Sequence, residues 1–218
     1  MRFSKPLPPI YLARHAETVF NRGARMQSQH GHSPLTTVGI GQAQAMAAAA
    51  LNHFGVRPDI RFWCSSAGRT QQTAAIVADA LEFDFFDIRL DDRLQEIHVG
   101  EWTGKPYHEV FASHGVVIDP THRLFSVRPP GGEWYDDIAV RMQSWLDDLS
   151  TETKPCLVIS HGIAARVLRG LLLGGTDYDG TAMAVDLPQG TMVRIENGTE
   201  TPLIIGSGSA DERVLESA

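Results

Sequence analysis

The feature of the sequence that most limits its fold is the alternation of short apolar runs with longer helix-forming segments. Residues 10–13, 60–64 and 156–159 have the length and composition of buried strands. The helices that follow them are predicted from Thr36 or Thr37 to Leu51, from beyond Ser66 to Leu81, and from beyond Gly162 to Leu171. This alternation predicts a three-layer α/β/α fold with a mostly parallel central sheet.

The remaining segments add shorter elements to this frame. Residues 133–149 place Ile138, Met142, Trp145 and Leu149 on one face, which predicts a late helix. Further elements are predicted as a third strand at 83–88, a short helix at 107–114, and late strands at 192–195 and 203–205.

The chain is expected to form one domain over residues 1–218. Residues 14–34 lack periodicity and are rich in polar residues, so they form a long loop of the kind that is usually functional. Residues 105–130 contain several prolines beside the short helix and are interpreted as a lid or insert. The tail from about residue 206 is expected to be flexible.

The charge balance limits the partners that the protein can have. Lys plus Arg total 19 and Asp plus Glu total 26, which gives a net charge of −7. This acidic balance argues against nucleic acid and against anionic membranes as partners. It does not exclude a small anionic substrate, because a pocket can be positive on an acidic protein.

The two cysteines and the N-terminal residues indicate a cytoplasmic protein. Cys64 and Cys156 each lie in an apolar, strand-like run, which favours two reduced thiols in the core. Residues 1–9 contain three prolines and no apolar stretch, so no signal peptide is expected. No apolar stretch approaches membrane-spanning length. The sequence is compatible with a homodimer but does not determine the oligomeric state.

Three polar clusters directly follow predicted strands: Arg14-His15, Ser65-Ser66 with Arg69, and Ser160-His161. Ligands of open α/β sheets bind beyond the carboxyl ends of the strands, so these side chains are expected to meet at one edge. Two imidazoles and two guanidiniums repel one another unless an anion sits among them. Because arginine forks match the oxygens of a phosphoryl group, the clusters predict a phosphate-binding site.

The same residues resemble the signature of the histidine phosphatase superfamily, which includes the cofactor-dependent phosphoglycerate mutases. The first motif is Arg14-His15-Ala16-Glu17-Thr18 with Asn21. The later matches follow in the family's order: Arg25-Met26-Gln27; Ser33-Pro34-Leu35-Thr36 with Gly39 and Gln42-Ala43; Ser65-Ser66 with Arg69 and Gln72-Thr73-Ala74; Leu94, Glu96, Gly100, Trp102 and Gly104; Pro130-Gly131-Gly132-Glu133; and Ser160-His161-Gly162 with Arg166. The resemblance covers about residues 10–171 and implies a phosphoglycerate mutase-like fold.

The resemblance also implies a role for each catalytic residue. His15 would be the nucleophile and would form a phosphohistidine. Arg14 and Arg69 would neutralise the transferring phosphoryl group, and His161 would donate a further hydrogen bond to it. Glu96 would protonate the leaving oxygen and then accept a proton from water. The implied substrate-binding residues are Arg14, Asn21, Arg69, His161, Arg25 and Thr36.

This chemistry works by positioning and electrostatic stabilisation, so neither a metal nor a cofactor is expected. His30 and His32 lie two apart in a loop and make a weak metal signal without a third ligand. Glu17 is interpreted as a structural carboxylate that orients the arginines, and Trp102 as a packing anchor.

Two departures from the family pattern bear on the activity. Ala16 stands where the family usually has glycine, and alanine restricts the backbone. The mutases follow the acidic residue with an Arg-His-Tyr-Gly run, whereas Glu96 here precedes Ile97-His98-Val99-Gly100. The missing arginine and tyrosine favour the phosphatase branch, in which water accepts the phosphoryl group.

The sequence therefore ranks three functions. The first is a metal-independent phosphomonoesterase of the histidine acid type, acting on a small phosphorylated metabolite. The second is a phosphoglycerate mutase. The third is a scaffold that binds phosphate without catalysis, which the proton donor Glu96 argues against. Sugar phosphates, phosphoglycerate-like acids, nucleotide-loop phosphates and phosphoproteins all remain open as substrates.

Overall fold

The computed structural model of the chain describes residues 7–174 and 184–208. Six strands form one sheet in the order β3-β2-β4-β1-β5-β6. Their bounds are β1 Ile10–Arg14, β2 Arg61–Cys64, β3 Arg89–Leu90, β4 Cys156–Ser160, β5 Met192–Glu196 and β6 Thr199–Ile204. Strands β3, β2, β4 and β1 pair in parallel, and β5 is antiparallel to both β1 and β6. The predicted mostly parallel α/β sheet is confirmed.

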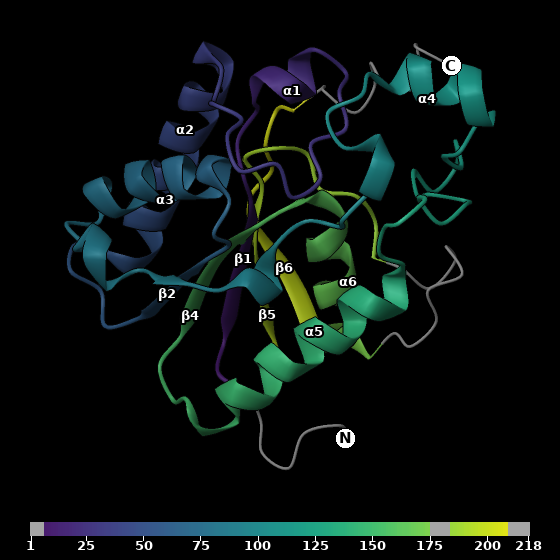
Figure 1. The fold of residues 1–218 in the computed structure, drawn as a ribbon. Coiled ribbons are helices and arrows are strands. Elements are labelled where there is room, and N and C mark those ends of the chain that lie inside the picture. The colour runs from purple at the N-terminus through teal and green to yellow at the C-terminus, as the bar shows by residue number, and fades with distance from the viewer. Residues whose placement is uncertain (1–6, 175–183, 209–218) are drawn as a thin grey trace.

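The central strands β1 and β4 are buried on both faces and divide the core in two. Along β1, Ile10 and Leu12 pack into one cluster of buried residues, while Tyr11 and Ala13 pack into another. The first cluster lies under α5 (Tyr135–Asp148) and α6 (Gly162–Leu173), and the second under α2 (Thr37–Phe54) and α3 (Gly68–Ala80). Figure 1 shows these helix pairs on opposite faces of the sheet, as a three-layer fold requires.

Capping residues define the ends of the long helices. Thr36 precedes α2, and its hydroxyl accepts a hydrogen bond from the Gly39 N–H at 3.0 Å. The alanine-rich sequence of α2 continues to Phe54, beyond the predicted end at Leu51. Helix α6 ends at Gly174, which has a left-handed φ of 87°. The ends of these helices therefore lie close to the positions that the sequence predicts.

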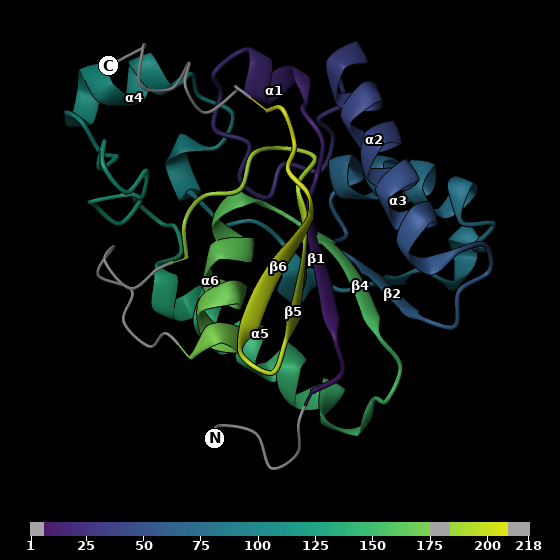
Figure 2. The same cartoon turned by 180° about the vertical axis from the view of Figure 1, so that it is seen from behind.

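The carboxyl ends of the parallel strands are covered by irregular segments and short helices. Helix α1 (Val19–Arg22) and helix α4 (Tyr107–His114) lie at this end of the sheet in both views (Figures 1 and 2). A backbone bridge between Arg25 and Pro106 joins the first long loop to the start of the 105–130 segment. A second bridge, between Ile118 and Phe125, closes a hairpin-like turn within that segment. Trp102 is buried against Phe125, as expected of a packing anchor.

Two predicted elements differ in the structure. The prediction of a strand at 83–88 is wrong, because residues 85–87 form the 3₁₀ helix η1 and the paired strand β3 is only Arg89–Leu90. Asp84 accepts a hydrogen bond from the Phe86 N–H, which favours this turn over an extended backbone. The loop at 14–34 contains helix α1, whose four residues are too few to show a helical period.

Both cysteines are free and buried, in agreement with the prediction of reduced core thiols. Burial raises the pKa of each thiol to about 12. In the part of the tail that is described, Gly206 donates its N–H to the Thr191 hydroxyl at 2.9 Å; the rest of the predicted flexible tail, residues 209–218, lies outside the described residues. Within the described ranges, no helix has the length and apolarity to cross a membrane.

Candidate active site

A pocket opens at the carboxyl edge of the sheet, where the three polar clusters meet. Its inner wall includes Arg14 and His15 from the end of β1, Arg69 from α3, and Glu96 from the irregular segment after the 3₁₀ helix η2 (Asp92–Leu94). His161 precedes α6 and lies behind His15, with 5.2 Å between the two ring centroids. The predicted convergence of these residues is thus present in the structure.

The ring of His15 is held in one tautomer. Its Nδ1 lies 2.8 Å from the Ala16 carbonyl oxygen, which accepts hydrogen bonds only, so Nδ1 carries the proton. The lone pair of Nε2 accepts a bond from the Arg69 Nε at 3.3 Å. Ala16 is fully buried and is not among the residues with positive φ, so alanine fits here without backbone strain. The replacement of the usual glycine leaves the imidazole in place.

Arg69 is a buried cation held by backbone carbonyls. Its side chain donates from Nη2 to the Ser28 carbonyl at 2.8 Å and from Nη1 to the His30 carbonyl at 3.1 Å. Burial lowers the pKa of Arg69 to about 10, because desolvation disfavours the charged form; nearby Glu96 acts in the opposite direction. The guanidinium stays charged at neutral pH and has lost part of its hydration, which suits it to bind an anion.

The guanidinium of Arg14 is held by residues that lie far away in the sequence. Its Nη1 donates to the Leu187 carbonyl and pairs with the Asp186 carboxylate at 3.2 Å. The guanidinium also lies against Gly162, where a Cβ would stand 3.2 Å from the Arg14 Cζ. Glycine at the first position of α6 therefore leaves the space that the guanidinium occupies.

His161 is completely buried, and its ring is kept neutral. Its Nε2 lies 2.8 Å from the Ser65 hydroxyl oxygen, and its Nδ1 has no hydrogen-bond partner among the described residues. Desolvation by burial lowers the pKa of His161 well below its usual value, and the positive charge of Arg69 adds to this shift. The Ser65 hydroxyl can donate or accept this bond, and when it donates, the neutral ring carries its proton on Nδ1. Unlike Arg14, His15 and Arg69, His161 is not among the residues that line the pocket.

The Glu96 carboxylate lies at the N-terminus of α6. It accepts hydrogen bonds from the backbone N–H groups of Ile163 at 3.3 Å and Ala164 at 3.0 Å. It also accepts the N–H of Ile97 at 3.0 Å. Exposed N–H groups in the first turn of a helix hold a carboxylate well. Glu96 lines the same pocket as His15, which is the placement that a proton donor to a leaving group requires.

The other predicted substrate-binding residues divide into two groups. Asn21 and Arg25 line the pocket. The Asn21 Oδ1 accepts the Thr18 N–H at 3.1 Å and so helps to cap α1. The amide NH₂ of Asn21 remains as a donor. Thr36 does not line the pocket; its hydroxyl caps α2 and donates to the Glu17 carboxylate at 2.6 Å. Glu17 therefore contacts Thr36 in place of the arginines expected from the sequence.

Other site residues were missed at the level of sequence. Asp186 pairs with Arg14 from 172 positions away, and no motif marks it. Ser65 belongs to a recognised motif, but its contact with the His161 ring depends on the pairing of β2 with β4. Among the described residues, no group of three or more His, Cys, Asp and Glu side chains could hold a metal ion, and His30 and His32 have no third ligand there.

Comparison with known proteins identifies a family for the chain. The family model of the histidine phosphatase superfamily (branch 1) matches residues 10–205. The "Probable phosphoglycerate mutase GpmB" of Yersinia pestis (strain Pestoides F) is 36% identical over 172 residues, covering 76% of this chain and 74% of that protein.

Solved structures share the fold at lower identity. A mycobacterial glucosyl-3-phosphoglycerate phosphatase in complex with VO₃ superposes with a TM-score of 0.71 at 24% identity, over 86% of this chain and 90% of that one. A structure named mycobacterial hydrolase 1 has a TM-score of 0.74 at 22% identity, over 93% of this chain and 99% of that one. The matching family model and the close curated relative together show that the chain belongs to the histidine phosphatase superfamily, branch 1.

Proposed function

We propose that the protein is a metal-independent phosphomonoesterase that forms a phosphohistidine on His15. The observation on which this rests is the fixed tautomer of His15, which leaves Nε2 unprotonated in a residue that lines the same pocket as Glu96. Arg14 and Arg69 would bring positive charge to the phosphoryl oxygens, and His161, which lies behind His15, would act as a neutral donor when its proton is on Nδ1.

The reaction would proceed in two displacements. In the first, the His15 Nε2 attacks phosphorus, the bond from phosphorus to the ester oxygen breaks, and the Glu96 carboxyl gives its proton to that oxygen. In the second, water attacks phosphorus, the phosphorus–nitrogen bond breaks, and the Glu96 carboxylate accepts a proton from the water. Phosphate and the alcohol are the products, and His15 and Glu96 return to their starting states.

The rest of the pocket, apart from the catalytic residues, favours a small organic leaving group. Apolar side chains line it beside the polar ones, at Met26, Ile97, Val99, Tyr107 and Phe125. Arg123 and Arg25 add positive charge to this part. A phosphorylated metabolite with both apolar and anionic portions matches this lining.

A phosphoglycerate mutase is the second candidate, since the curated relative from Yersinia pestis bears that name. Two observations rank it below hydrolysis. Ile97 and Val99 face the pocket where the mutases have polar gripping residues. The two superposed mycobacterial structures are named as a phosphatase and a hydrolase, although their identity to this chain supports only a common fold.

The proposal is tested by phosphate release from a panel of phosphomonoesters, with and without a metal chelator. We expect turnover that the chelator does not affect, and an acid-labile, base-stable phosphoenzyme trapped by rapid quenching. His15→Ala should abolish both, by on the order of 10⁴-fold or more in kcat, because the nucleophile is gone.

The same assay separates the alternatives. Conversion of 3-phosphoglycerate to its 2-isomer with a bisphosphoglycerate primer, faster than phosphate release, would establish the mutase instead. Binding of phosphate without turnover of any ester would favour a scaffold. Chelator-sensitive turnover that survives His15→Ala would contradict the phosphohistidine mechanism.

A further inference from the structure

The Glu96 carboxylate is carried by a segment with no regular backbone pairing. Residues 96–99 belong to no helix or strand. Side chains from elsewhere bind the backbone instead: the Ser28 hydroxyl donates to the Ile97 carbonyl at 3.2 Å and accepts the Val99 N–H at 2.9 Å, and Gln29 donates to the Glu96 carbonyl at 3.2 Å. These side chains therefore place the backbone of Glu96, while the N–H groups of Ile163 and Ala164 hold its carboxylate.

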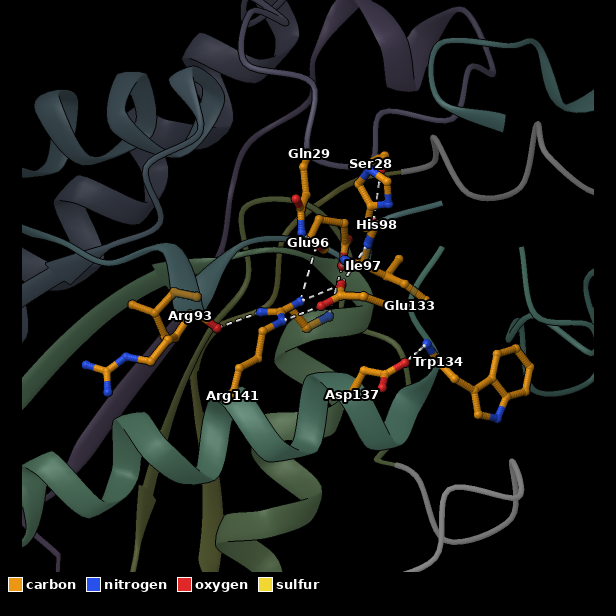
Figure 3. A network of polar contacts seen from close by, with 12 residues as sticks. Ser28, Gln29, Arg93, Glu96, Ile97, His98, Glu133, Trp134, Asp137 and Arg141 are labelled. Atoms are coloured by element: carbon orange, nitrogen blue, oxygen red, sulfur yellow. Dashed lines mark hydrogen bonds and ion pairs between the residues drawn. The ribbon is translucent and has the colours of Figure 1, made fainter. Parts of the chain in front are cut away.

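One arginine joins this segment to the residues before it. Arg141 extends from α5 toward the segment, and its guanidinium lies between the Arg93 carbonyl and the Glu133 carboxylate (Figure 3). Its Nη1 donates to the Arg93 carbonyl at 2.6 Å, and its Nη2 donates to the Glu96 carbonyl at 3.3 Å. The planar guanidinium thus fixes the distance between the carbonyl groups of Arg93 and Glu96, which are three residues apart.

Glu133 holds both the arginine and the other side of the segment. Its Oε1 accepts from the Arg141 Nε at 2.9 Å, and its Oε2 accepts the His98 N–H at 2.8 Å. The Glu133 N–H in turn donates to the His98 carbonyl at 2.8 Å. The side chains of Arg141 and Glu133 are only 16% and 20% exposed, so solvent does little to weaken the pair.

The backbone at His98 lies too close to the backbone at Gly132 to admit a side chain at residue 132. A Cβ at Gly132 would stand 2.5 Å from the His98 carbonyl oxygen. The backbone at 98 and the backbone at 132–133 are therefore in direct contact, and a shift of one would move the other. Because Glu96 lies two residues from this contact, a shift of Glu133 would move the backbone that carries its carboxylate away from the N–H groups of Ile163 and Ala164.

We infer that Arg141, held by Glu133, is a positioning residue that places the Glu96 carboxyl for proton transfer to the leaving oxygen. This inference rests on the proposed function, since it assumes that Glu96 is the proton donor. Arg141 is not among the residues that line the pocket, and it acts through the backbone carbonyl of Glu96. A displacement of about 1 Å at a catalytic group is enough to slow a reaction by about two orders of magnitude.

The variant Arg141→Lys tests the inference with two esters. Lysine keeps the charge but has one nitrogen, which cannot bridge the carbonyls of Arg93 and Glu96 in the geometry of the guanidinium. An alkyl ester such as glycerol 2-phosphate needs a proton on its leaving oxygen, whereas p-nitrophenyl phosphate releases a stable phenolate. The measurement is kcat/KM, which reports the steps up to release of the leaving group.

We expect Arg141→Lys to lower kcat/KM for glycerol 2-phosphate by about 10- to 100-fold, within the range by which general acids act. For p-nitrophenyl phosphate the fall should stay below about threefold, since little proton transfer is needed there. A role confined to folding would lower both rates alike. Arg61→Lys is the matched control, because Arg61 forms a comparable ion pair with Glu152 at the amino end of β2, away from the pocket.

Equal losses on the two esters, or no loss on either, would overturn the inference and leave the phosphatase intact. If the wild-type protein releases phosphate from no ester of the panel, the proposed function is overturned and the inference with it; if it turns over only other esters, one alkyl ester and one aryl ester from among those replace the pair. If Arg141→Lys does not fold, Glu133→Gln decides by the same comparison. The glutamine is close in shape but weakens the bond to Arg141, so the loss should again be larger for the alkyl ester.

Discussion

The inner and outer halves of the pocket are built in opposite ways. In the inner half, Arg14, His15 and Arg69 are 6%, 3% and 1% exposed, and each is held by hydrogen bonds to the backbone or to a carboxylate. In the outer half, Arg25 and Arg123 are exposed and lie on irregular segments. The inner half is fixed by the fold, whereas the outer half depends on loops.

This difference separates the chemistry from the choice of substrate. Buried dipoles and charges that are already oriented stabilise a transition state without reorganising, so the inner half suits phosphoryl transfer. Loops at a strand-end pocket vary more readily and commonly set specificity. Substitutions in the inner half should therefore reduce turnover of every ester, and substitutions in the outer half should change the preference among esters.

Among substitutions that keep the nucleophile His15, the largest effect is expected from Arg69→Lys. Lysine cannot replace the three directed bonds to His15, Ser28 and His30, so two carbonyls lose their donor and the phosphoryl site loses its fork. We expect kcat/KM to fall by on the order of 100-fold for all esters. Stability should fall by about 1–3 kcal/mol, measured by urea unfolding.

The exposed pair Arg57–Glu82 provides the control for this substitution. Arg57→Lys should leave both turnover and stability within the range of surface changes. A fall in kcat/KM for Arg69→Lys that is confined to one ester would contradict the assignment of Arg69 to the inner half.

A smaller loss is expected from Gly162→Ala. The new methyl group would stand 3.2 Å from the Arg14 guanidinium, which Asp186 and Leu187 keep from moving aside freely. We expect kcat/KM to fall by about tenfold for every ester, as a misplaced phosphate-binding group would produce. Gly170→Ala on the same helix is the matched control, because a Cβ there meets no other side chain or segment within 4 Å.

Gly170→Ala should keep full activity and raise the stability of α6 by up to about 1 kcal/mol. If the two variants lose activity equally, the crowding of Arg14 is not the cause.

Much of this inner half was predictable, because its residues follow strands that their own composition reveals. His15 and His161 directly adjoin apolar runs, so the parallel sheet alone brings them to one edge. The role of Asp186 was not predictable, since its contact with Arg14 joins residues that are 172 positions apart and no local sequence pattern indicates it. Thr36 was predicted to bind substrate, but a threonine directly before a helix can also cap it, and this is what its hydroxyl does in α2.

The buried imidazole of His161, which lies behind His15, should make the free energy of unfolding depend on pH. Burial lowers its pKa in the folded state below the ordinary value of 6.5, so below pH 6.5 the unfolded chain binds a proton that the folded one does not. The free energy of unfolding should therefore decrease as the pH falls from 6.5 toward the lowered native pKa, by at most about 1.4 kcal/mol per pH unit. Above pH 6.5 this contribution is constant.

His161→Gln removes the titration and should flatten this part of the profile, whatever its effect on stability at neutral pH. Urea unfolding of both proteins at several pH values between 5 and 8 measures the difference in slope. Parallel profiles would contradict the burial of a neutral imidazole at this position.

The smallest effect, and the one that addresses the outer half directly, is expected from Arg123→Ala. Arg123 lines the pocket from the turn closed by Ile118 and Phe125, and an exposed arginine contributes about 0.2–1 kcal/mol to binding a carboxylate. KM for 3-phosphoglycerate should therefore rise up to about fivefold, while KM for glycerol 3-phosphate, which lacks the carboxylate, stays unchanged. Added salt should reduce the difference, because it screens exposed charges. Arg128→Ala, which removes an exposed arginine paired with Asp137 outside the pocket, is the control. Equal changes in KM for the two esters would mean that the outer half does not select its substrate by charge, and would leave its apolar residues as the source of preference.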